Sequence, residues 1–133
     1  MLAFGSFPSH FTESQTMSAS AHSLTYVKFL HLANALRQGP GAPELDSLEE
    51  RLLNSLAAAW HTGHRIKVLE VARLLPDTSE RTIFRRLKTL EDKGLITFMT
   101  DPQDQRVRHV LPTPKTDAYF ARLGECMSLA HQG

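Results

Sequence analysis

Apolar residues recur at helical spacing in five segments of the chain, which predicts five helices. These segments are 25–38, 46–61, 67–75, 80–93 and 113–131. Residues 95–99 and 107–111 are instead typical of two short strands, and the turn-forming stretch 101–105 between them completes a predicted hairpin. A short extended piece at 65–66 precedes the third helix. Residues 1–20 show no sustained period, and we expect them to form a disordered tail.

Local signals support these boundaries. Asp46 followed by Glu49 is a capping-box pair at the start of the second helix. Ser79 closes a run of residues that favour the N-cap of the fourth helix, and Gly94 favours its C-terminal end. Thr113 followed by Pro114 is the expected opening of the last helix.

The order of elements predicts a winged helix-turn-helix: a mainly α chain with a small β-hairpin (α+β). We expect one domain over residues 21–133, with a DNA-binding core at 45–112. The helices at 24–38 and 113–131 flank this core. Their broad apolar surfaces favour a role in dimerisation, although burial within the same domain explains them equally well.

Composition narrows the class of protein. The chain has 133 residues, 41% of them hydrophobic, and a net charge of +1, which is typical of one soluble globular domain. No apolar run reaches the roughly 20 residues that would span a membrane. The single cysteine excludes an internal disulfide and favours the reducing cytoplasm. No nucleophile motif, phosphate loop or clear metal-ligand spacing is present, so we expect neither enzymatic activity nor a cofactor.

The positive charge is concentrated in one part of the chain. Residues 65–112 hold ten Lys and Arg against seven Asp and Glu, whereas residues 1–64 carry a net charge of −2. On the fourth helix Arg81, Arg85 and Lys88 recur at helical spacing opposite the apolar face. A helix enters the major groove of DNA, where arginine can bond guanine in bidentate fashion. The ridge alone favours an ordinary solvated helix face, whose Arg and Lys side chains need no partner.

The predicted hairpin adds a second basic surface. Asp104, Arg106 and Arg108 alternate along it, so they project from one side if the strand is regular. Asp104 can then orient Arg106, and an arginine on a thin hairpin is suited to a narrow minor groove. Together, the helix and the hairpin favour double-stranded DNA as the partner.

Four short signals in this order resemble the MarR family of bacterial transcription regulators. The stretch 79–85 is similar to the opening of that family's recognition helix, and 90–96 is similar to the junction that follows. The stretch 101–106 resembles its wing, and Thr113-Pro114 resembles the start of its next helix. The resemblance implies sequence-specific DNA binding, usually by a homodimer that represses transcription.

By position, the resemblance implies that Ser79, Thr82 and Arg85 contact DNA from the recognition helix. It implies that Arg106, oriented by Asp104, does so from the wing. Helix and hairpin geometry adds further candidates, which are Arg81, Arg86, Lys88 and Arg108. Phe84 departs from the family pattern, because a small polar residue is common there.

Two other functions fit the same sequence. Phe84 on the exposed flank of the fourth helix favours a winged-helix module that binds protein without sequence-specific DNA binding. Alternatively, Trp60, Tyr26 and Phe29 line a cleft for a small-molecule effector, although core packing also explains these three aromatic residues.

Overall fold

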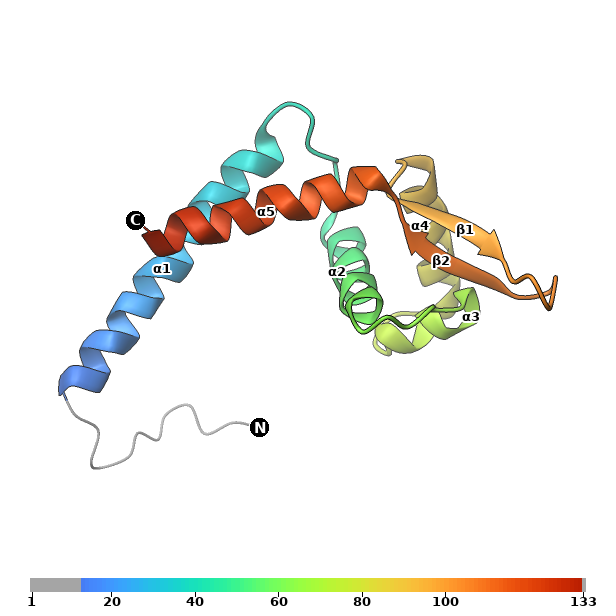
Figure 1. The fold of residues 1–133 in the computed structure, drawn as a ribbon, viewed down its shortest axis with the longest axis horizontal. Helices are drawn as coiled ribbons and strands as arrows, with labels where there is room; N and C mark the ends of the chain where they lie inside the picture. The colour runs from blue at the N-terminus through green and yellow to red at the C-terminus, as the bar shows by residue number, and fades with distance from the viewer. Residues whose placement is uncertain (1–12, 133) are drawn as a thin grey trace. The chain divides into compact units, whose positions relative to one another are not determined.

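The chain is described by a computed structural model over residues 13–132, with side chains from residue 19 onward. Its long helices are α1 (Glu13–Gln38), α2 (Ser47–His61), α4 (Glu80–Asp92) and α5 (Pro114–Gln132) (Figure 1). The short α3 (Val68–Val71) continues into a 3-10 turn, η1 (Ala72–Leu74). Strands β1 (Ile96–Thr100) and β2 (Arg108–Pro112) form an antiparallel hairpin. The predicted fold class, mainly helical with one small hairpin, is confirmed.

The described residues divide into two compact units. One contains residues 41–121, and the other combines the described part of 1–40 with residues 122–132. The expectation of a single domain over 21–133 stays a prediction. Helix α5 belongs to both units, because a helix satisfies its own backbone hydrogen bonds and can extend beyond the core that holds its first turns. The expected core at 45–112 lies entirely within the first unit.

The core of the 41–121 unit forms where three helices meet the hairpin. Ile83, Leu87 and Leu90 of α4 are at most 1% exposed, as the sequence predicted. They are joined by fully buried leucines of α2 and by apolar residues from the other elements. These are Leu52, Leu53, Leu56, Val71, Ile96 and Val110. Because one face of α4 is held in this core, its opposite face is directed outward.

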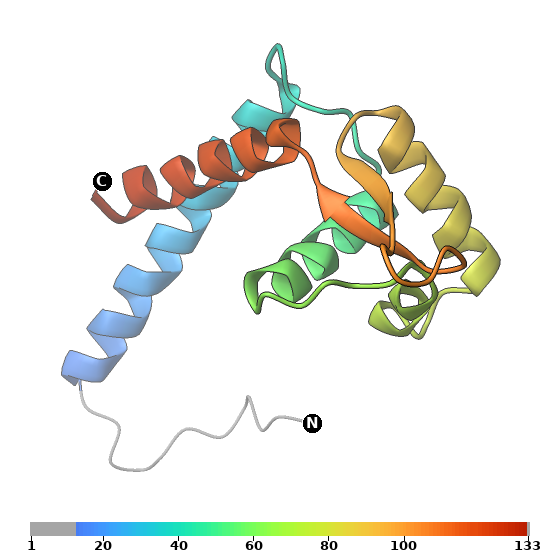
Figure 2. The same ribbon diagram turned by 45° about the vertical axis from the view of Figure 1, so that its right-hand side comes forward.

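The hairpin begins one residue later than expected at both strands. The Leu95 amide donates to the Leu90 carbonyl at 3.0 Å, so it bonds back to α4 beyond the helix end, and the strand starts only at Ile96. The register pairs Ile96 with Pro112 and Thr100 with Arg108. The loop between the strands projects from the unit as the wing, defined here as residues 101–107 (Figures 1 and 2).

The third helix is shorter than the predicted segment 67–75. Only Val68–Val71 is α-helical, and Leu75 has a non-helical backbone with φ −129° and ψ 75°. Pro76 follows directly, and a proline disfavours the helical conformation of the residue before it. The α3–α4 connection is therefore a 3-10 turn followed by a short loop.

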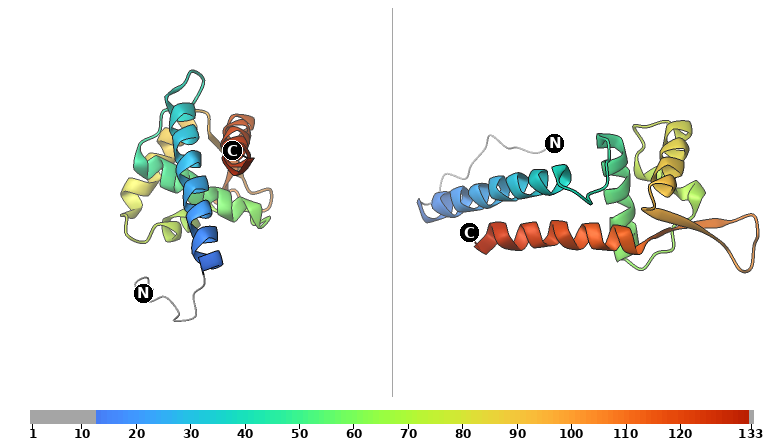
Figure 3. Two further views of the ribbon diagram at one scale, coloured as in Figure 1. Left: turned by 90° about the vertical axis from the view of Figure 1, so that its left-hand side faces the viewer. Right: turned by 90° about the horizontal axis from the view of Figure 1, so that it is seen from above.

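Helix α1 begins at Glu13, so the predicted tail over 1–20 is wrong for residues 13–20; residues 1–12 lie outside the described residues. Residues 19–24 are all exposed, and a helix without a buried face leaves no hydrophobic period in the sequence. In the unit that contains α1, this helix lies beside the end of α5 (Figure 3). Residues of both helices line a shallow pocket. None of the described helices is both long and apolar enough to cross a membrane.

Candidate nucleic-acid interface

Helix α4 starts at a capped N-terminus that also carries two candidate DNA contacts. The Ser79 hydroxyl accepts the Thr82 amide at 3.2 Å and lies 2.9 Å from the Thr82 hydroxyl. Ser79 has an extended backbone, as an N-cap residue should. Both hydroxyls remain at the first turn, where the positive end of the helix dipole favours an anion.

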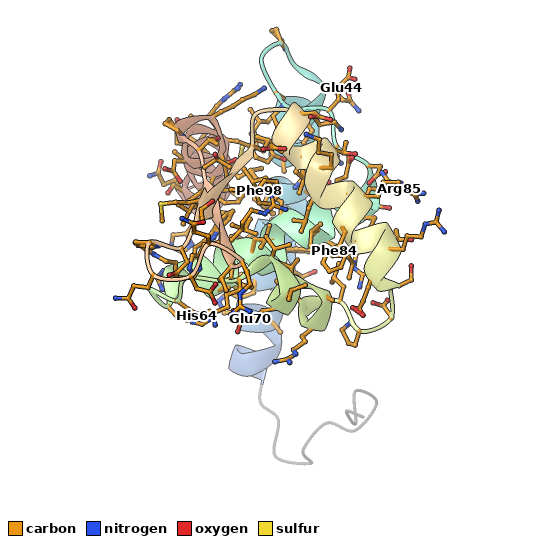
Figure 4. All side chains as sticks on the ribbon, turned by 90° about the vertical axis from the view of Figure 1, so that its right-hand side faces the viewer. Glu44, His64, Glu70, Phe84, Arg85 and Phe98 are labelled. Carbon is orange, nitrogen blue, oxygen red and sulfur yellow. The ribbon has the colours of Figure 1, made fainter. Side chains whose placement is uncertain are left out.

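Arg81 and Arg85 form an uncompensated basic pair on the outer face of α4. Both are exposed, and within residues 13–132 neither guanidinium has an ion-pair or hydrogen-bond partner. Arg85 projects outward from the helix in Figure 4. A free, planar guanidinium retains all five donors for a phosphate or a base edge. These two arginines therefore have the properties expected of DNA contacts.

The two other basic candidates on α4 are already engaged. Lys88 lies 3.0 Å from Glu91 and 3.6 Å from Asp92. The hydrogen bond to Glu91 and both carboxylate charges raise the Lys88 pKa, so the ammonium stays protonated while two carboxylates of its own helix offset its charge. Arg86 points to the opposite side of α4, where it pairs with Asp46 and with buried Glu49 of the α2 N-terminus. Arg86 thus joins α4 to α2, and its predicted contact with DNA stays a prediction.

The wing holds Arg106 outward on a carboxylate support. Its Nε atom lies 3.2 Å from Asp104 Oδ1, and the same oxygen accepts the Arg106 amide at 3.1 Å. The Arg106 side chain is nonetheless 91% exposed. Hydrogen bonds from the Arg106 side chain and amide hold the pKa of Asp104 below its ordinary value. The predicted pairing of these residues is present, and it leaves the far edge of the guanidinium free.

Arg108 lies closer to the helices, over the ring of Phe98. Its guanidinium carbon is 4.7 Å from the ring centroid, within the range of a cation–π contact. Phe98, Phe84 and Leu87 line one depression between α4 and the hairpin, whose α3 side is formed by Val68 and Leu69 (Figure 4). Leu69 is 78% exposed. The depression between α4 and the hairpin thus has an apolar floor, and its charged lining residues are Lys88, Glu91 and Arg108.

Two residues at the base of the wing were missed by the sequence analysis. Asp101 Oδ1 accepts the amides of Gln103 and Asp104 at 2.8 and 3.1 Å, and its Oδ2 lies 2.9 Å from His109 Nε2. The hydrogen bond with His109 and those from the two amides lower the Asp101 pKa. An aspartate two residues before an exposed amide is a recognisable turn signal. No pattern along the chain marks His109.

Trp60, one of the proposed effector residues, links two elements of the 41–121 unit. Its indole N–H donates to the Val110 carbonyl at 2.9 Å and so attaches α2 to β2. Tyr26 and Phe29 line the pocket of the other unit together with Met127. No group of three His, Cys, Asp or Glu side chains among the described residues is arranged to hold a metal ion. Cys126 is buried.

Comparison with known proteins gives likeness in structure alone. No family model matches the sequence. No curated protein matches it either. The structure is similar to S. aureus MepR bound to ethidium bromide, with a TM-score of 0.62 and 18% identity over 94% of this chain and 81% of that one.

Two further solved structures are similar. The transcriptional repressor CouR, solved on a 23-mer DNA duplex, has a TM-score of 0.54 and 20% identity over 91% of this chain and 76% of that one. The transcriptional regulator Tm0710 of Thermotoga maritima has a TM-score of 0.58 and 17% identity over 87% and 73% of the two chains. Identities of 20% or less establish a fold and not a function. The chain has the winged-helix fold of MarR-type transcription regulators.

Proposed function

We propose that this protein is a transcription regulator that binds double-stranded DNA sequence-specifically, as a homodimer, and represses the promoter it occupies. The proposal rests on one observation: three arginine side chains of one winged helix each have guanidinium donors left free. Arg81 and Arg85 are unpaired on α4, and Arg106 is 91% exposed on the wing. In the winged-helix arrangement such a helix enters the major groove, and the wing reaches the adjacent minor groove.

Two of the structural neighbours support this proposal. CouR was solved on a DNA duplex, and a MepR variant was solved with an oligodeoxyribonucleotide. In this chain the polar and basic residues proposed to contact DNA are Ser79, Arg81, Thr82, Arg85, Lys88, Arg106 and Arg108, with Asp104 as the support of Arg106. Arg86 is left out because it is engaged with α2.

Dimerisation is supported by apolar surface that the described chain leaves uncovered. Tyr26 on α1 is 61% exposed, and Met127 and Leu129 on α5 are 60% and 56% exposed. Leu24, Val27 and Leu30 of α1 are exposed as well. Grouped apolar residues at the surface mark protein–protein contacts. The partner we propose is a second copy of this chain.

Selection from a random duplex pool tests the function, followed by measurement of mass and stoichiometry on the selected duplex. We expect a two-fold symmetric site whose half-sites lie about one helical turn, ~34–36 Å, apart, bound by two chains. Recovery of unrelated sequences, or one chain per duplex, would contradict sequence-specific binding by a dimer.

Replacing Arg106 with alanine is expected to weaken binding to the selected duplex about tenfold, close to the cost of one charge-assisted hydrogen bond to the groove. The loss should shrink when A·T pairs under the wing are changed to G·C, since a narrow A·T minor groove attracts arginine. Titrations of the wild type and the variant against both duplexes measure the loss of affinity on each. An equal loss of affinity on the two duplexes would show that the wing does not contribute to sequence specificity.

A second function is favoured by one observation, the apolar floor beside α4. Leu69 and Phe84 border a depression that suits an apolar side chain of a protein partner. The two functions differ in a simple titration of labelled random duplex at low salt. Absence of binding at micromolar protein would favour the protein-interaction module.

A further inference from the structure

A buried imidazole lies beneath the wing. His109 of β2 is 4% exposed, and its backbone bridges to Lys67, which precedes α3. Its Nε2 lies 2.9 Å from Asp101 Oδ2. Its other ring nitrogen, Nδ1, is buried without a hydrogen-bond partner among residues 13–132. This side chain therefore makes one polar contact and leaves one polar atom unsatisfied.

Stability by itself does not explain a histidine at this position. A buried polar atom without a partner is unfavourable, and few occur in folded proteins. A leucine would fill a similar volume without an unsatisfied nitrogen, and replacing a buried polar pair by apolar residues is often neutral or stabilising. The remaining contribution of His109 is its contact with Asp101.

Asp101 is the centre of the wing turn. One of its carboxylate oxygens, Oδ1, accepts the amides of Gln103 and Asp104. Its own amide donates to the Val107 carbonyl at 2.8 Å, across the base of the loop. The terminal torsion of an aspartate is soft, so two amide contacts on one oxygen leave the other oxygen free to swing. His109 holds that second oxygen.

The contacts continue from Asp101 to the wing arginine. The Asp104 amide bonds to Asp101, and the Asp104 carboxylate in turn holds both the amide and the guanidinium of Arg106. The Val107 amide donates to the Asp104 carbonyl at 3.0 Å and closes the same turn. A change in the orientation of the Asp101 carboxylate therefore reaches Arg106 through a single intervening residue.

We propose that His109 is a positioning residue of the wing: its imidazole fixes the Asp101 carboxylate, and through Asp104 it sets the direction of Arg106. The effect on DNA rests on the proposed function, whereas the effect on the wing does not. His109 contacts no DNA itself, because it lies beneath the hairpin surface.

The free protein tests the first half of this proposal. In the His109→Leu variant we expect an unchanged or higher melting temperature, together with amide exchange at Gln103 and Asp104 that is about tenfold faster. Asp101→Asn should accelerate the same amides, and it serves as a second variant if His109→Leu does not fold. His109→Gln keeps an N–H donor and should return exchange toward the wild-type rate.

Leu56→Ala is the matched control, because it opens a cavity in the core at a fully buried residue of α2. It should lower the melting temperature and leave exchange at Gln103 and Asp104 at the wild-type rate. If His109→Leu behaves like this control, or leaves the wing amides as slow as in wild type, His109 is only a core residue and the proposal is wrong.

A double-mutant cycle on the selected duplex tests the second half. His109→Leu should weaken binding about fivefold when Arg106 is present, and should cause no further loss in the Arg106→Ala background. Additive losses in the cycle would overturn the link to Arg106. If the wild-type protein binds no duplex, the proposed function fails, and the exchange experiment still decides whether His109 positions the wing.

Discussion

The Arg85→Ala variant is expected to lose about 1–3 kcal/mol of binding free energy on the selected duplex and much less on unrelated duplexes. Arg85 is exposed on the outer face of α4 and has no partner within residues 13–132, so its donors are available for a guanine edge. Titration of the wild type and the variant against the selected duplex and a scrambled one measures both losses. An equal loss on the two duplexes would refute base recognition by Arg85.

Lys88→Ala is the matched control on the same helix. Glu91 and Asp92 already neutralise part of the Lys88 charge. A remaining phosphate contact would be independent of sequence, so we expect a small and equal loss on all duplexes and a shallower salt dependence. Comparison of the two variants separates a contact that reads bases from one that contributes only charge.

Glu49→Ala is expected to destabilise the protein by about 3 kcal/mol. The Glu49 side chain is 3% exposed, accepts the Asp46 amide at 3.0 Å, and lies 2.8 Å from Lys93 Nζ and 3.4 Å from Arg86. Its removal leaves two half-buried cations without this carboxylate and deletes the α2 capping box. Chemical denaturation measures the change.

Exposed Asp77 provides the control for this stability measurement. It pairs with Arg51 at 3.3 Å, but both side chains are more than half exposed. Solvent screens such a pair, so Asp77→Asn should leave the denaturation midpoint close to that of wild type. A comparable loss in the two variants would show that the Glu49 cluster does not stabilise the fold as argued.

The Glu49 cluster also predicts how stability responds to acid. Burial raises the pKa of Glu49, but hydrogen bonds from Lys93 and the Asp46 amide outweigh it, so the folded-state pKa lies below the ordinary value of 4.5. A carboxyl group whose pKa is lowered by folding contributes stability that is fully present above 4.5 and is lost as pH falls through the folded pKa. In the Glu49→Gln variant, the melting temperature should therefore fall less steeply than in wild type as the pH drops below 4.5.

Elements with strong local signals could be predicted from the sequence. The Asp46–Glu49 capping box, the Ser79 cap and the left-handed Gly94 at φ 78° all depend on residues close together in the chain. The buried face of α4 followed from the spacing of Ile83, Leu87 and Leu90. The start of α1 was missed, and residues 19–24, the first of this helix whose side chains are described, are all exposed.

The residues of the candidate site also fall into those that local spacing indicated and those that it missed. Local spacing indicated the Asp104–Arg106 pair, since the two residues are two positions apart on one loop. Arg86 looked equivalent to Arg85 along the helix, but its partners Asp46 and Glu49 lie about forty residues earlier in the chain. Contacts of such separation leave no periodic signal, so the ion pairs that join Arg86 to the start of α2 were missed.

The sequence by itself determined the order of elements, the apolar face of α4 and the basic residues on its other side, because helix periodicity and end caps act over a few residues. Only the tertiary structure decided which of those cations remain free and what supports the wing. The attachment of Arg86 to α2 depends on how separate segments pack. So does the placement of His109 beneath the hairpin, where burial among distant residues gives one imidazole nitrogen a partner and leaves the other without one.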